Sequence, residues 1–161
     1  MPDMRIVKYP DSVLKKEASK VGKVSEKERK LLADMASIMY LNQGVGLAAV
    51  QVGIGRQLAV IDIGKGLIKM INPTITRKEG SETQEEGCLS VPGVTVKVKR
   101  AKKVTVTYLD ESGEVKELRA DGLLARAIQH EIDHLCGRLI INYLNPLKKL
   151  LVKNRLNKLD K

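Results

Sequence analysis

Residues 121–137 read DGLLARAIQHEIDHLCG, and this stretch contains the strongest fold information in the chain. Its apolar residues recur three and four positions apart, which predicts a helix. They fall on both sides of that helix, so we expect it to be largely buried. Asp121 is suited to cap its first turn and Gly137 to end it.

Five short segments rich in Val, Ile and Thr precede this helix, and their composition predicts strands. They are QLAVIDI, LIKMINPTI, VTVKVKR, KKVTVTYLD and EVKELRA, all within residues 57–120. VTVKVKR alternates strictly, so one of its faces is expected to be exposed and basic. Residues 110–113, DESG, are placed to form a turn between the last two strands.

Two further helices are expected outside the strand region. Ser25 and Glu28 form a capping-box pattern that opens a helix running to about Leu41. Asn145 and Pro146 are suited to begin a basic C-terminal helix. The order of helix, antiparallel strands, helix and helix predicts an α+β fold in one domain, residues 1–161, with residues 145–161 as the basic helix.

Composition excludes several classes of protein. The 161 residues include 43% hydrophobic residues, with no Phe or Trp and no apolar run long enough to span a bilayer. We expect no membrane association, and the absence of a targeting signal favours the cytoplasm. The net charge of +10 fits either a polyanionic partner or an ordinary basic domain. The shortage of aromatic rings argues against recognition of single-stranded nucleic acid by stacking.

The only two histidines, His130 and His134, lie four positions apart with Glu131 between them. On a helix this spacing puts both imidazoles on one face, where they can share a metal ion. Glu131 lies beside that face and can take a proton from a metal-bound water. The same face carries Leu123 and Ala127, which we expect to wall a pocket for an unbranched apolar side chain.

A third metal ligand is expected upstream of the two histidines. Position 140, where one class of metalloprotease has a histidine, is Ile140, and no Glu follows His134. Cys136 projects to the opposite side of the helix, which leaves Cys88 as the remaining thiol. One thiolate with two imidazoles favours zinc or ferrous iron over magnesium or calcium.

Residues 44–51, GVGLAAVQ, combine two glycines with small residues. Such a segment permits close approach of another backbone or a substrate. It lacks the Lys-Ser/Thr of a phosphate-binding loop, so we expect no nucleotide cofactor.

Three segments together resemble the peptide deformylase family: GVGLAAVQ at residues 44–51, EEGCLS at 85–90 and QHEIDH at 129–134. The resemblance implies an α+β fold with antiparallel sheets around a central HExxH-bearing helix. It implies an enzyme that removes the formyl group from the N-terminal formyl-methionine of newly made polypeptides and releases formate. In that reaction metal-bound water attacks the formyl carbon, with Glu131 as general acid and base.

The resemblance also assigns the site residues and the cofactor. The implied cofactor is one divalent metal ion, Fe²⁺ in the cell, with Zn²⁺, Ni²⁺ or Co²⁺ as substitutes in purified protein. The implied ligands are Cys88, His130 and His134, the oxyanion donors are the Gln51 amide and the Leu89 N–H, Gly46 contacts the substrate backbone, and Val45 faces Leu123 and Ala127 across the methionine pocket.

Two features depart from the family pattern. Arg126 stands where many relatives have an apolar residue, and its position beside the metal-facing stripe leaves the polarity of the pocket rim open. The segment after Pro92 lacks an arginine that some members place near the substrate backbone, so peptide affinity is expected to differ.

Partners and alternative functions follow from the same resemblance. N-formylmethionyl nascent peptides are the expected substrates, the basic C-terminal helix is a candidate for ribosome contact, and we expect a monomer. A general HExxH peptidase and a non-catalytic ribosome or RNA binder with a structural metal are the alternatives. The substitution Glu131→Gln separates an enzyme from a binder.

Overall fold

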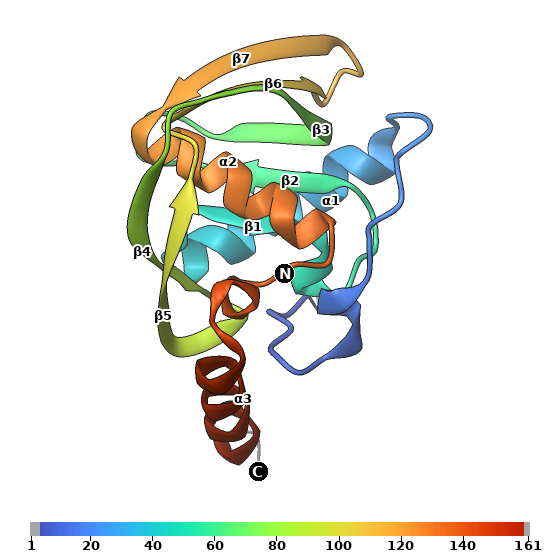
Figure 1. Cartoon of the computed structure of the whole chain (residues 1–161). Helices are drawn as coiled ribbons and strands as arrows, with labels where there is room; N and C mark the ends of the chain where they lie inside the picture. Colours follow the sequence, from blue (N-terminus) through green and yellow to red (C-terminus); the bar gives the residue numbers. More distant parts are fainter. Residues whose placement is uncertain (1–3, 160–161) are drawn as a thin grey trace.

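The computed structural model describes residues 4–159, and these form two antiparallel sheets and three α-helices (Figure 1). The α+β class predicted from the sequence is confirmed. The elements are η1 (Ser12–Lys15), α1 (Glu26–Leu41), β1 (Gly46–Ala48), η2 (Ala49–Val52), β2 (Leu58–Ile61), β3 (Ile68–Glu79), β4 (Glu82–Cys88), β5 (Val91–Arg100), β6 (Lys103–Leu109), β7 (Val115–Asp121), α2 (Gly122–Leu135), η3 (Ile140–Tyr143) and α3 (Pro146–Leu159).

The larger sheet has the strand order β1-β2-β3-β6-β7, and β4 and β5 form a separate two-stranded sheet. Strand β2 pairs with β1 on one side and β3 on the other, with Leu58 opposite Ile71 and Val60 opposite Leu47. All four residues of β2 are buried. This double burial explains why QLAVIDI is apolar without alternation, since both faces of a central strand are covered.

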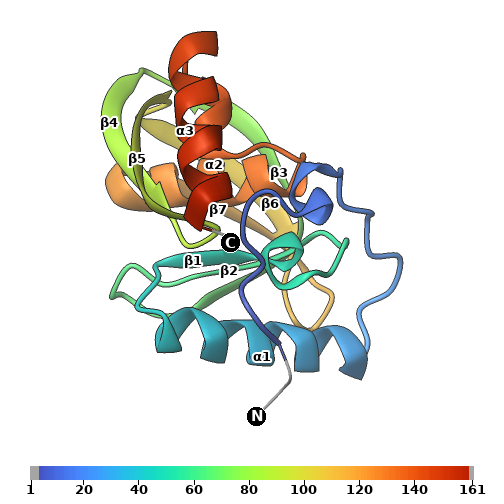
Figure 2. The same cartoon turned by 90° about the horizontal axis from the view of Figure 1, so that it is seen from below.

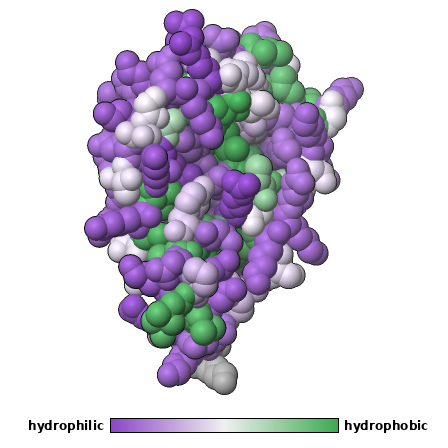
Figure 3. Space-filling view, in the orientation of Figure 1, coloured by the Kyte–Doolittle hydropathy of each residue, from purple (hydrophilic) through white to green (hydrophobic). Residues whose placement is uncertain are grey.

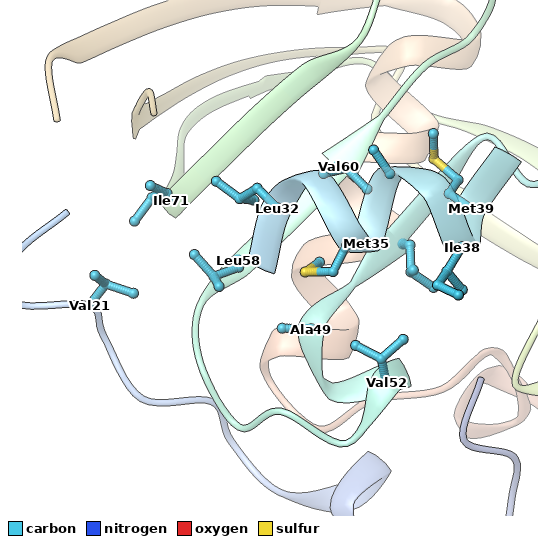
Figure 4. Packing of buried hydrophobic residues seen from close by; sticks show 12 residues of the cluster. Val21, Leu32, Met35, Ile38, Met39, Ala49, Val52, Leu58, Val60 and Ile71 are labelled. Carbon is cyan, nitrogen blue, oxygen red and sulfur yellow. The ribbon is translucent and has the colours of Figure 1, made fainter. Parts of the chain in front are cut away.

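The larger sheet lies between two helices (Figure 2). Helix α1 packs on β1 and β2, and helix α2 packs on β1, β2, β6 and β7. Figure 4 shows Leu32, Met35 and Ile38 of α1 pointing into the cluster formed with the sheet. The cluster also contains Val21, Ala36, Met39, Leu47, Ala49, Val52, Leu58, Val60 and Ile71.

Helix α2 is the central element of the fold, as the resemblance predicted. Ala125, Ala127 and Ile128 pack into a cluster with Val104 and Val106 of β6. The helix ends before Gly137, whose φ of 78° is a left-handed conformation typical of helix C-termini. Asp121 occupies the N-cap position, but its side chain accepts no capping hydrogen bond, contrary to the sequence prediction.

Two strands were absent from the sequence prediction. Strand β4 is polar (ETQEEGC), and only Glu86 within it is fully buried, so it lacks the Val, Ile and Thr content that marked the others. Strand β1 has only three residues. Cys88 is the last residue of β4.

Helix α3 begins at Pro146 with Asn145 as its cap, as predicted, and the Asn145 side chain accepts from the Lys148 N–H at 2.8 Å. Leu156 packs against the β5–η3 cluster. Within residues 4–159, no helix combines the length and the apolar character that a membrane crossing requires.

The capping-box region of α1 yields a stability prediction. The buried Glu28 carboxylate accepts from the Ser25 N–H at 2.8 Å, from Ser25 Oγ at 2.7 Å and from Arg56 at 2.8 Å. The hydrogen bond from the Ser25 side chain is the main reason that the pKa of Glu28 lies below its ordinary value of 4.5. We expect Glu28→Gln to reduce the free energy of unfolding by about 1–2 kcal/mol at pH 7.

The difference between wild type and Glu28→Gln is expected to depend on pH. A carboxyl whose pKa is lowered by folding stabilises the protein above the unfolded pKa, and this stabilisation is lost as the pH falls through the folded pKa. The free energies of unfolding of the two proteins, measured with urea, should therefore converge as the pH falls below 4.5. Glu26→Gln, an exposed position in the same turn, is the control. An equal difference at pH 7 and pH 3 would contradict the prediction.

Candidate metal centre

Three potential metal ligands meet where the end of β4 approaches α2. Within residues 4–159, Cys88, His130 and His134 are the one group of three His, Cys or acidic residues whose ligand atoms lie within 4.8 Å of one another. His134 Nε2 lies 3.1 Å from His130 Nε2 and 3.3 Å from Cys88 Sγ. Cys136 is exposed and is not a member of this group.

The donor atoms suit a divalent transition metal. Metal–nitrogen bonds of about 2.1 Å and metal–sulfur bonds of about 2.3 Å in a tetrahedron separate the ligand atoms by about 3.4–3.6 Å, a few tenths more than the spacing seen here. Glu86 lies 2.9 Å from Nδ1 of His130, which leaves Nε2 free to face the other donors. Burial lowers the pKa of His134 well below its usual value, which favours the neutral ring that binds metals, whereas for His130 the contacts with Cys88, Glu131 and Glu86 outweigh burial and raise the pKa to about 10.

Glu131 lies next to this donor set and is buried, with 4% of its surface exposed. Its Oε1 finds no hydrogen-bond partner within the described part of the chain. Burial raises the pKa of the Glu131 carboxyl to about 7. A buried carboxyl with a free oxygen and a pKa near neutrality is suited to both accept and release a proton.

Glu131, Cys88 and His130 line a cavity of about 570 Å³, whereas His134 is buried and is not among its lining residues. One wall comes from residues 43–46, and the opposite wall from α2 and from residues 84–89. Val45 and Leu123 are about half exposed at its mouth, while Ala127 is buried. The lining includes nine of the residues singled out from the sequence: Val45, Gly46, Gln51, Cys88, Leu89, Leu123, Ala127, His130 and Glu131.

The Gln51 side chain is fixed with its amide nitrogen toward the cavity. Its Oε1 accepts from the Ala48 N–H at 3.0 Å. Its Nε2 donates to Ser90 Oγ at 3.2 Å and lies 3.6 Å from Cys88 Sγ. Leu89, half-buried, follows Cys88 in the chain and lines the same cavity. Gln51 and Leu89 therefore both lie at the cavity beside Cys88.

Four residues that the sequence analysis did not single out form a hydrogen-bond network that ends at Nδ1 of His130. They are Glu86, Arg100, Asp133 and Tyr143. Arg100 donates to both oxygens of Glu86, at 2.8 and 2.9 Å, and to Asp133 at 2.7 Å. Tyr143 donates to Asp133 and lies over Arg100. Burial alone would raise the pKa of Glu86, but the hydrogen bonds from Arg100 and His130 hold it well below its usual range.

The sequence did contain a sign of this network. The inward residues of VTVKVKR are Val94, Val96, Val98 and, by the same alternation, Arg100, which is 5% exposed. A buried arginine needs an acidic partner. The alternation therefore indicated a buried ion pair, although only the fold shows that its partner is Glu86.

Arg126 is one of the residues that line the cavity, and its contacts show where its charge is directed. The residue is 8% exposed. Its guanidinium donates to Glu86, to the Val98 carbonyl and to the Glu82 carbonyl. The charge is thus turned toward β4 and β5 rather than toward the cavity mouth.

Gly46 touches Glu131, and this contact gives a testable prediction. A Cβ built on Gly46 would overlap Glu131 Oε2, the movable end of a side chain. We expect Gly46→Ala to fold but to displace the carboxylate, and a displacement of about 1 Å can lower a reaction rate by about 100-fold. The measurement is kcat/KM for formate release, with circular dichroism as the test of folding.

Gly55→Ala is the matched control for Gly46→Ala, because a Cβ at Gly55 meets nothing within 4 Å. The control should keep wild-type kcat/KM. A folded Gly46→Ala protein with wild-type kcat/KM would show that the Gly46–Glu131 contact has no functional role.

The α+β fold and this donor set define the chain as a candidate metal-dependent enzyme of the HExxH kind. The sequence profile described as polypeptide deformylase matches residues 3–150. The chain is 53% identical over 135 residues to the peptide deformylase of Thermoanaerobacter pseudethanolicus, covering 84% of this chain and 85% of that protein. It is 46% identical over 160 residues to the peptide deformylase of Thermodesulfovibrio yellowstonii, covering 96% of this chain and 97% of that protein.

Solved structures agree with the sequence comparisons. A peptide deformylase from Legionella pneumophila superposes with a TM-score of 0.92 at 44% identity, covering 98% of this chain and 95% of that one. A peptide deformylase from Ehrlichia chaffeensis in complex with actinonin superposes with a TM-score of 0.97 at 37% identity, covering 100% and 99%. The chain therefore belongs to the polypeptide deformylase family and is an enzyme of that family.

Proposed function

We propose that this enzyme removes the N-formyl group from the N-terminal formyl-methionine of newly made polypeptides and releases formate. The observation that carries the proposal is the buried Glu131 carboxylate, which lies beside a Cys-His-His donor set in a cavity with apolar walls. A reaction on newly made chains places the enzyme in the cytoplasm.

Cys88, His130 and His134 would hold one divalent metal ion. Two neutral imidazoles and one thiolate leave a net charge of +1 and suit Fe²⁺, which we propose for the cell, or Zn²⁺, Ni²⁺ or Co²⁺ in purified protein. When bound, such an ion supplies Lewis acidity and lowers the pKa of water.

Glu131 moves the proton. As a carboxylate it accepts a proton from the attacking water, and as a carboxylic acid it returns that proton to the amine that leaves as the new N-terminus. Its pKa of about 7 suits both roles at neutral pH.

Gln51 and Leu89 stabilise the negative charge that develops on the formyl oxygen. The Gln51 amide is fixed in advance by its bonds to Ala48 and Ser90, so little reorganisation is needed during the reaction. The Leu89 N–H is held by the end of β4. Fixed donors of this kind are worth about 3–4 kcal/mol each in other hydrolases.

The substrate backbone is proposed to lie along β1, which is an edge strand of the larger sheet. Gly46 has no side chain to block this approach, and an extended peptide can pair with a free strand edge. The methionine side chain would then enter the cavity between Val45 on one wall and Leu123 and Ala127 on the other.

Formate release from a formyl-methionyl tripeptide tests the proposed function. The protein is purified without oxygen and loaded with Fe²⁺, because a thiolate-ligated ferrous site is expected to be oxygen-sensitive. We expect stoichiometric formate and free α-amine, and no cleavage of the remaining peptide bonds. Internal cleavage would favour a peptidase, and a folded, metal-loaded protein that releases no formate would favour a binding role.

We also propose that helix α3 contacts the ribosome. Leu147, Leu150 and Leu151 are between half and two-thirds exposed. Figure 3 shows the hydrophobic patch at the end of the molecule where α3 projects. Of Leu147, Leu150, Leu151 and Leu156, only Leu156 packs against the domain.

A charge-reversal experiment tests the ribosome contact without removing Leu156 from the core. Lys148, Arg155 and Lys158 are exposed on α3, and their combined replacement by Glu should abolish salt-sensitive co-sedimentation with ribosomes. Replacing the exposed Lys20, Lys23 and Lys27 by Glu causes the same change in net charge elsewhere and should preserve binding. Equal binding by both triple variants would refute the proposal.

A further inference from the structure

Arg126 makes contacts that the proposed reaction has not used. It lies on α2 one turn before His130 and is buried. Its Nη1 contacts Glu86 Oε2 at 2.5 Å and the Val98 carbonyl at 2.9 Å, and its Nη2 contacts the Glu82 carbonyl at 2.7 Å. One side chain on the histidine-bearing helix thus holds both β4 and β5.

The carboxylate of Glu86 is shared among three side chains. Oε2 accepts from Arg100 and Arg126, while Oε1 accepts from Arg100 and faces Nδ1 of His130 at 2.9 Å. The two arginines approach Oε2 from β5 and α2, respectively. Because Oε2 is held from both sides, the carboxylate cannot rotate without breaking a charged hydrogen bond, and Oε1 stays directed at the imidazole.

The charges behind the donor set also balance. Glu86 and Asp133 contribute two carboxylates, and Arg100 and Arg126 contribute two guanidiniums, all joined by ion pairs. With an apolar residue at position 126, the buried Glu86 and the partly buried Asp133 would share a single guanidinium. An incompletely paired buried carboxylate is costly, so Glu86 would be expected to move toward water.

We propose that Arg126 is a positioning residue that fixes the orientation of His130 through Glu86. The metal-binding part of this inference depends only on the Cys-His-His donor set, and its effect on the reaction rests on the proposed function. Arg126 also lines the cavity beside Ala127, and its Nη2 joins α2 to β4 through the Glu82 carbonyl.

Arg126→Leu tests the proposal through metal binding. Removal of a group that orients a metal-ligating histidine typically costs 10–100-fold in metal affinity or activity. Because Arg100 still holds Glu86, we expect about tenfold faster dissociation of Co²⁺ into a chelator, with an altered visible absorption spectrum of the Co²⁺-loaded protein. Deformylation should show a lower kcat with little change in KM, because the orientation of His130 rather than the substrate pocket is disturbed.

Arg119→Leu is the matched control. Arg119 is exposed on β7, where its backbone lies opposite Thr105 of β6, and its side chain makes no hydrogen bond or ion pair with a described residue. This variant removes the same charge from the surface and should leave Co²⁺ dissociation and the spectrum unchanged. If both variants lose Co²⁺ equally fast, the faster dissociation is caused by the lower net charge, and the proposal is overturned.

Arg126→Lys keeps the proposal testable if the leucine variant does not fold. Lysine retains the charge and the alkyl stem, but its single nitrogen cannot hold Glu86 and both carbonyls in the planar geometry of a guanidinium. We expect Co²⁺ to dissociate from Arg126→Lys at a rate between those of the wild type and Arg126→Leu. Wild-type Co²⁺ dissociation and spectrum in the folded lysine and leucine variants would overturn the proposal. A wild-type protein that binds Co²⁺ but releases no formate would refute the proposed function and leave this comparison valid.

Discussion

Glu131→Gln is expected to abolish formate release while leaving the metal bound. Glutamine has nearly the same shape as glutamate but cannot accept the proton of the attacking water. General acid–base catalysis typically contributes about 10²- to 10⁴-fold, and Glu131 is proposed to act in both proton transfers, so we expect a loss near the upper limit. The measurement is kcat for formate release, together with metal content by elemental analysis.

The control for Glu131→Gln is Glu117→Gln, which removes one carboxylate from an exposed position on β7. This control should retain wild-type kcat. Glu131→Gln with full activity would remove Glu131 from the reaction. Loss of both activity and metal would show that Glu131 supports the donor set rather than the proton transfer.

Cys88→Ala is expected to cause the largest loss of metal affinity. Removing a group that only orients a ligand costs about 10–100-fold, so removal of the ligand itself should cost at least about 100-fold. Two histidines also leave the ion with too few protein ligands for a stable catalytic centre. Chelator competition with Co²⁺ measures the affinity, and loss of the intense sulfur-to-cobalt absorption reports the missing thiolate directly.

Cys136→Ala is the internal control, because Cys136 is the other cysteine of the chain and is exposed. It should bind Co²⁺ as the wild type does. Wild-type Co²⁺ affinity in Cys88→Ala would exclude Cys88 as a ligand. A reduced Co²⁺ affinity in Cys136→Ala would show that Cys136 contributes to the metal site and would contradict the assignment of the sulfur ligand to Cys88.

The sequence was sufficient for the elements whose stability depends on apolar patterning. Helices α1 and α2 and strands β2, β3, β5, β6 and β7 follow from periodicity and composition, because each buries apolar side chains at regular positions. Strand β4 could not be found in this way, since it is polar and mostly exposed and is stabilised by pairing with β5 and by the ion pairs of Glu86.

The residues of the site also divide into those that local sequence patterns predict and those that only the tertiary structure reveals. His130 and His134 were predictable because ligands one turn apart on a helix are determined by local geometry. The orientation of Arg126 was not predictable, because a helix position does not reveal that the Glu82 and Val98 carbonyls and Glu86 surround it. Long-range partners of a buried charge are a property of the tertiary structure.

The donor set joins positions far apart along the chain, since the Cys88–His134 contact spans 46 residues. Neither β4 nor α2 holds all three donors, and each is placed by its own packing partners. Bringing these positions together has an entropic cost, and folding of the whole domain offsets that cost before any ion binds. Competence to bind the ion is therefore cooperative: it arises together with the native state, and a chain that ends before α2 has no partial version of it.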